Sequence, residues 1–180
     1  LRCRRPPRST PYPYTPLFRS ELPVPANLGW DLWLGHAPKQ PYRNGIHPSR
    51  WRCYLDFGAG TLGDMGVHIF DAPFKALNLS YPSWVKTTCR KPNGFGHPGS
   101  NTVEYSFERT EYTTEDLRWI WFDGGHVATM KIPELKLPEG RKFPSQGAVY
   151  VGEKGCILHP HTSGPIFYPA SIKQSIKKPD

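Results

Sequence analysis

The sequence predicts an α+β fold: a mainly antiparallel open β-sheet with helices packed on one face. Residues 84–159 hold six short runs rich in β-branched and aromatic residues, separated by Gly, Pro and Asn breaks. Before these runs, apolar residues recur at helical spacing between Leu62 and Leu77. Because short turns join neighbouring strands in antiparallel fashion, we expect one sheet with this helix on one of its faces.

The composition is that of a globular domain. The chain has 180 residues, of which 37% are hydrophobic and 13% aromatic, enough for one domain with a proper core. The 21 prolines and 17 glycines predict long irregular connections. No apolar run reaches about 18 residues, and no apolar stretch follows the basic N-terminus, so we expect neither a membrane span nor a signal peptide. We therefore predict a cytoplasmic protein.

The positive charge lies mostly in the first 20 residues. The formal net charge is +8, and this segment carries five arginines and no acidic residue, which leaves 8 − 5 = +3 for the remainder. Without basic and aromatic residues interleaved in the body, we expect no nucleic-acid binding. Residues 11–20 look like a translated sequencing adapter, so residues 1–20 are predicted to be foreign or disordered. The predicted domain organisation is therefore a tail (1–20), one domain (21–170) and a frayed C-terminal end (171–180).

An aromatic cluster follows the proline-rich linker of residues 21–29. We expect Trp30 and Trp33 to cover the core. His47, Trp51 and Arg52 come just before a glycine-rich turn, and an aromatic ring beside hydrogen-bond donors suits the apolar face and hydroxyl rim of a sugar. These three are predicted to bind substrate in the same cleft as His68.

The segment 57–77 predicts a loop that feeds a helix over 62–77. Glycines there cost up to about 1 kcal/mol each relative to alanine in a helix, so another backbone or a ligand is expected to approach closely. Pro73 is expected to kink the helix or to end its first half near Ala72. The glycines stand at positions 58, 60, 63 and 66.

Asp64 and His68 are four residues apart, so a helix places them on one face, one turn apart. A carboxylate that orients an imidazole is the minimal proton-transfer pair. The alternative is that Asp64 caps the start of the helix and His68 is an ordinary half-buried histidine.

The strands are predicted at residues 84–89, 102–107, 117–122, 127–132, 148–151 and 156–159, with tight reversals at 123–125 and 152–155. One helix is expected to leave part of the sheet's aromatic face uncovered. Exposed apolar area of this kind indicates an interface, so we predict a homo-oligomer packed through the sheet. The aromatic residues concerned are Tyr105, Phe107, Trp119 and Trp121.

The four cysteines, at positions 3, 53, 89 and 156, form no C-x-x-C pair and fit a reducing compartment or buried thiols better than a disulfide framework. His159 and His161, or Asp64, His68 and Asp71, could contribute metal ligands. Neither set has a recognised zinc spacing, so no metal site is predicted.

Three stretches in order resemble one family. Residues 58–71 read Gly-x-Gly-x-Leu-x-Asp-x-Gly-x-His-x-x-Asp with Gly63 as an additional glycine, and residues 30–52 and 149–157 provide the other two matches. Together they resemble the C-terminal domain of the Gfo/Idh/MocA oxidoreductases, of the bacterial type. The resemblance covers most of residues 21–170.

The resemblance implies a function. His68 would be the general base that takes the substrate hydroxyl proton as hydride leaves the same carbon for NAD or NADP, and Asp64 would orient it. The substrate would be a sugar or polyol, bound also by His47, Trp51, Arg52 and Asp71. The alternative function is a non-catalytic carbohydrate-binding or oligomerisation module.

The chain lacks the family's cofactor motifs in the context that the dinucleotide site requires. There is no Gly-x-Gly-x-x-Gly after a strand, and the Glu-Lys-Pro motif of the family is missing. We therefore expect the chain to be a C-terminal fragment whose NAD or NADP is bound mainly by a missing Rossmann domain. On this interpretation the isolated chain is inactive.

Overall fold

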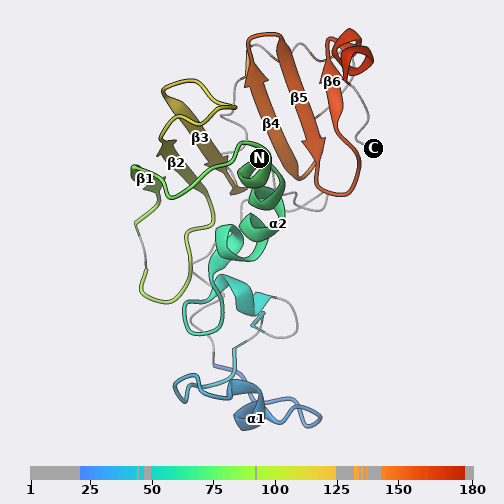
Figure 1. Cartoon of the computed structure of the whole chain (residues 1–180). Coiled ribbons are helices and arrows are strands. Elements are labelled where there is room, and N and C mark those ends of the chain that lie inside the picture. Colours follow the sequence, from blue (N-terminus) through green and yellow to red (C-terminus); the bar gives the residue numbers. More distant parts are fainter. Residues whose placement is uncertain are drawn as a thin grey trace. The chain divides into compact units, whose positions relative to one another are not determined.

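The computed structural model describes residues 21–43, 45–46, 50–91, 93–124, 132–133, 135, 137 and 143–176 (Figure 1). These residues belong to two compact units. Unit 2 contains the described residues up to Asp64 together with 90–99, and unit 1 contains 65–89 and those from Ser100 onward. The predicted tail 1–20 and positions 127–131 of the fourth predicted strand lie outside the described residues. No helix in the described ranges is long and apolar enough to cross a membrane.

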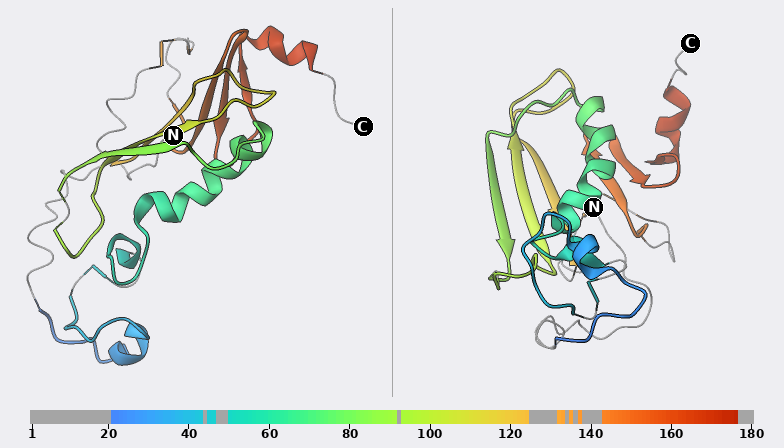
Figure 2. Two further views of the ribbon diagram at one scale, coloured as in Figure 1. Left: turned by 60° about the vertical axis from the view of Figure 1, so that its left-hand side comes forward. Right: turned by 90° about the horizontal axis from the view of Figure 1, so that it is seen from below.

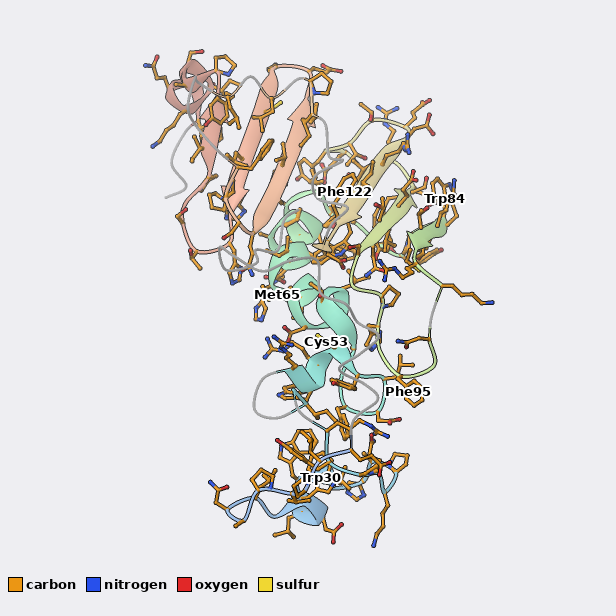
Figure 3. All side chains as sticks on the ribbon, turned by 180° about the vertical axis from the view of Figure 1, so that it is seen from behind. Trp30, Cys53, Met65, Trp84, Phe95 and Phe122 are labelled. Atoms are coloured by element: carbon orange, nitrogen blue, oxygen red, sulfur yellow. The ribbon has the colours of Figure 1, made fainter. Side chains whose placement is uncertain are left out.

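Unit 2 is built on aromatic packing. Helix α1 (Trp30–Leu34) and the 3-10 helix η1 (Arg50–Cys53) enclose a core of Trp30, Leu34, Ile46 and Tyr54. Trp33 stacks on Trp30 with ring centroids 4.9 Å apart, and aromatic side chains gather around Trp30 in Figure 3. The prediction that the first two tryptophans cover the core is confirmed.

Helix α2 (Gly60–Ala76) begins two residues before its predicted start and runs through Pro73 without ending near Ala72. The alternative that the helix ends there was wrong because proline removes only its own N–H from the ladder, and the chain beyond it still bonds: the Leu77 N–H donates to the Pro73 carbonyl at 3.0 Å. Whether Pro73 kinks the helix stays a prediction. Asp64 is the fifth residue of the helix, so the alternative that it caps the helix start is also wrong.

The first sheet has the order β1-β2-β3, all antiparallel. Its strands are β1 (Trp84–Cys89), β2 (Asn101–Phe107) and β3 (Leu117–Phe122), close to the predicted bounds. The register pairs Tyr105 with Trp119 and Val103 with Trp121. Since side chains alternate between faces, these four point to the same face of the sheet.

Helix α2 covers that aromatic face. The Phe70 ring lies edge-on to Tyr105, Trp119 and Trp121 at centroid distances of 5.8, 4.5 and 5.4 Å, and Phe74 contacts Phe107. Phe107 and Trp121 are buried. Tyr105 and Trp119 stay half-buried, so part of this face keeps some exposure, as expected. Two phenylalanines one turn apart on α2 cover the rest of it by reaching across two strands.

The second sheet has the order β4-β5-β6, also antiparallel (Figure 2). Strands β4 (Gly147–Gly152) and β5 (Gly155–Pro160) form the predicted hairpin, with Gly152 opposite Gly155. Strand β6 (Ile166–Tyr168) was not predicted, and η3 (Ala170–Ser175) occupies part of the segment expected to fray. The α+β class with antiparallel pairing is confirmed, although the described strands form two sheets rather than one.

The buried carboxylate of Asp123 connects the start of β2 with the end of β3. Asp123 is 1% exposed and accepts hydrogen bonds from the Asn101 backbone N–H at 2.7 Å and the Asn101 Nδ2 at 3.1 Å. The Trp121 Nε1–H donates to its other oxygen at 2.9 Å. The carboxylate is therefore fully occupied in holding the ends of two strands together.

Tyr150 on β4 provides a pH-dependent prediction. Burial raises the pKa of its phenol from 10.0 to about 12. Because the folded-state pKa is raised, the associated stability is fully present below pH 10.0 and is lost as the pH rises towards about 12. In an ultraviolet titration, Tyr150 should ionise in a late step near pH 12, and Tyr150→Phe should remove that step. If Tyr150→Phe leaves the titration unchanged, the assignment is wrong.

Candidate functional site

In unit 2, three of the predicted site residues meet. Arg52 Nη1 lies 3.4 Å from the Asp64 Oδ2, and the Arg52 guanidinium lies over the Trp51 ring at 5.5 Å from its centroid. The Asp64 and Arg52 side chains are 30% and 43% exposed, so the ion pair is open to water. Arg52 Nε is buried without a hydrogen-bond partner. His47 lies outside the described residues.

The glycine-rich turn is shaped by the chain's own atoms. A Cβ on Gly58 would lie 2.5 Å from the Arg52 Cα, and one on Gly60, whose φ is +69°, would lie 2.8 Å from the His97 ring. His97 Nε2–H donates to the Gly58 carbonyl at 2.7 Å, and the His97 backbone N–H donates to Cys53. Close backbone approach, one of the two predicted reasons for these glycines, accounts for Gly58.

Cys53 is not an activated nucleophile. Burial raises the pKa of its thiol, although the neighbouring Arg52 and Arg50 lower it in part. A raised pKa keeps the sulfur in its unreactive thiol form at neutral pH. Within the described part of the chain, the cysteines at positions 53, 89 and 156 are not paired in disulfides, and Cys156 is buried.

In unit 1, His68 is exposed on α2 and its ring meets the ring of His161 from the turn after β5. The two ring centroids are 5.4 Å apart at an interplanar angle of 65°. Asp71, the remaining predicted substrate-binding residue, forms an exposed 3.5 Å ion pair with Lys75 one turn further along α2.

Asp64 and His68 lie on one continuous helix with the predicted spacing of four. The Asp64 carboxylate pairs with Arg52, and the His68 ring contacts His161. An exposed imidazole can accept a proton from a bound alcohol, and a carboxylate paired with a guanidinium can accept hydrogen bonds from substrate hydroxyls.

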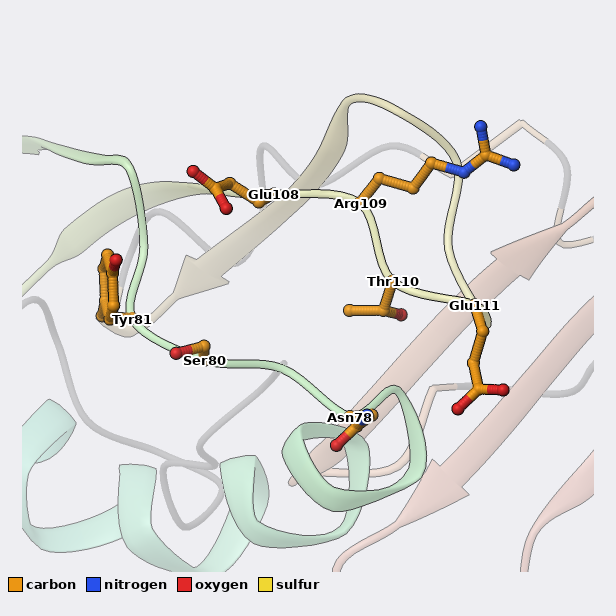
Figure 4. A pocket seen from close by; sticks show the side chains of 7 residues that line it. All are labelled: Asn78, Ser80, Tyr81, Glu108, Arg109, Thr110 and Glu111. Carbon is orange, nitrogen blue, oxygen red and sulfur yellow. The ribbon is translucent and has the colours of Figure 1, made fainter.

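Two cavities lie in the described part of unit 1, and neither is lined by a predicted site residue. One, of about 740 Å³, runs along β3 and β4 and is lined mainly by apolar side chains. The other, of about 330 Å³, is polar and lies between the segment after α2 and the segment after β2 (Figure 4). Among the described residues, no three His, Cys, Asp or Glu side chains are grouped to hold a metal ion.

A comparison with models of protein families gives a match. Residues 18–147 match the Gfo/Idh/MocA family model, which is described as the C-terminal alpha/beta domain of the oxidoreductase family. The chain belongs to this family. No curated protein matches it. The match includes α2 and the whole first sheet, and it ends at the first residue of β4.

The space beside Gly58 is taken by the Arg52 backbone and the space beside Gly60 by the His97 ring, so contacts within the chain account for these two glycines without a bound ligand.

Sequence reasoning missed three partners in the site: His97, His161 and Lys75. Lys75 could have been found, because an Asp four residues before a Lys on a helix is a recognised pair. His97 and His161 stand 39 and 93 residues from Gly58 and His68, and no local pattern indicates such contacts.

Proposed function

We propose that this domain is the substrate-binding part of an NAD(P)-dependent oxidoreductase acting on a sugar or polyol, with His68 as proton acceptor and Asp64 as the residue that orients it. The observation that carries the proposal is the Asp64-x-x-x-His68 spacing on one uninterrupted helix in a chain of this family. The nicotinamide that accepts hydride would be held by residues outside this chain.

Alcohol oxidation requires a base for the hydroxyl proton. The exposed imidazole of His68 can reach a bound substrate and accept that proton, a role typically worth 10²–10⁴-fold in rate. Asp64 carries the negative charge that would favour the imidazolium once it forms. The Arg52 ion pair would hold the Asp64 carboxylate in place during this step.

The remaining predicted residues would bind the sugar itself. Trp51, with the Arg52 guanidinium over its ring, offers an apolar surface next to hydrogen-bond donors. Asp71 and His47 would accept or donate to further hydroxyls. The homo-oligomer expected from the sequence also stays a prediction.

The test is a calorimetric titration of the chain with NAD, NADP and a panel of sugars and polyols. We expect no cofactor binding, and binding of at least one polyol that weakens about tenfold in His68→Ala and in Asp64→Asn, with His36→Ala as an exposed-histidine control. Cofactor binding by this chain alone, or polyol binding indifferent to both variants, would contradict the proposal. Indifference would favour the non-catalytic carbohydrate-binding module instead.

A further inference from the structure

We propose that His68 and His161 together bind one divalent transition-metal ion of the Zn²⁺, Cu²⁺ or Ni²⁺ class. The two imidazoles come from different elements of unit 1, helix α2 and the turn after β5, and their rings are in contact. Imidazole nitrogen is a preferred ligand for these metals. The site goes beyond the proposed function, since the oxidation proposed above requires no metal.

The distance between the rings fits a shared ion. A zinc ion lies about 2.0–2.1 Å from a ligating nitrogen and so about 3.2 Å from the ring centre, which puts two tetrahedrally placed ring centres about 5.2 Å apart. The observed centroid distance is 5.4 Å.

The surroundings leave room for a metal and its other ligands. His68 and His161 are both exposed, so water can complete the coordination. Asp71, three residues after His68, is tied to Lys75, and the described residues offer no third protein ligand grouped with the pair. A site with two protein ligands and open positions is an exchangeable site rather than a closed structural one.

The inference does not depend on the proposed function, although the two concern the same side chain. A metal on the His68 nitrogen occupies the lone pair that would accept a proton. A bound metal ion and the hydroxyl proton of the substrate would then compete for the same nitrogen atom of His68.

The test uses the full 180-residue chain and Zn²⁺ alone, titrated by calorimetry. We expect one bound ion per chain, and affinity at least tenfold weaker in His68→Ala and in His161→Ala. His161→Phe keeps an aromatic ring against His68 but no ligand, so it should lose binding as fully as His161→Ala. His159→Ala, which removes a neighbouring histidine on β5, is the matched control and should bind as the wild type does.

A spectroscopic measurement identifies the ligands directly. With Cu²⁺ in place of Zn²⁺, electron paramagnetic resonance should show coupling to two imidazole nitrogens in the wild type and to one in His161→Phe. Full affinity in His161→Phe, or an unchanged two-nitrogen signal, would overturn the proposal.

Discussion

Asp123→Ala is expected to lower the free energy of unfolding by about 3 kcal/mol. The substitution removes a 1% exposed carboxylate that accepts from the Asn101 backbone N–H, from its side-chain amide and from the Trp121 indole N–H. A buried donor that loses such an acceptor costs about 1–3 kcal/mol in stability. Urea unfolding followed by circular dichroism measures the change.

Two variants control for this effect. Asp123→Asn keeps one carbonyl acceptor and should cost less than Asp123→Ala. Asp71→Ala removes an exposed carboxylate from the same unit and should change stability by less than about 1 kcal/mol. If Asp123→Ala costs no more than Asp71→Ala, the buried network does not hold the ends of β2 and β3 together.

Gly58→Ala is expected to destabilise unit 2 by about 2–3 kcal/mol. The added methyl would lie 2.5 Å from the Arg52 Cα and 2.8 Å from its carbonyl oxygen, and these are backbone atoms that cannot rotate away. The turn must therefore move, which also displaces the Gly58 carbonyl from His97 and Arg52 from Asp64. Hydrogen exchange should show faster exchange at the His97 amide, which donates to Cys53.

Gly164→Ala is the matched control, because nothing lies within 4 Å of the Cβ it would add. It should leave stability and the His97 amide unchanged. Protection of that amide in Gly58→Ala equal to that in the control would show that the turn accepts a side chain and that backbone approach is not why glycine stands at position 58.

The sequence predicted best those features of the structure that depend on interactions between residues close together in the chain. The bounds of β1 and β3 match the prediction residue for residue, and the β4–β5 hairpin turns where its two glycines indicated. These features depend on alternation and turn chemistry among near neighbours, which a single sequence displays. The family motif, too, can be read directly from residues 58–71.

The candidate site depends in part on contacts between residues that are distant in sequence, and these were harder to predict. The spacing of Asp64 and His68 on a helix was predictable, because 3.6 residues per turn is a local property. Arg52 was expected in the same cleft, and it pairs with Asp64 from η1. The contact of His68 with His161 was not predictable, because His161 comes from beyond β5. Which side chains contact the helix depends on the conformation of irregular connecting segments, and local sequence patterns do not determine that conformation.

By itself, the sequence determined the fold class, most strand bounds, the helix that carries Asp64 and His68, and membership of the oxidoreductase family. Only the tertiary structure decided that Phe70 and Phe74 cover the aromatic face, that Asn101 and Trp121 satisfy Asp123, and that His161 meets His68. The physical reason is that hydrophobic periodicity indicates which face of a helix or strand is buried, but it does not indicate which residues pack against that face. That choice depends on the packing of elements distant in sequence.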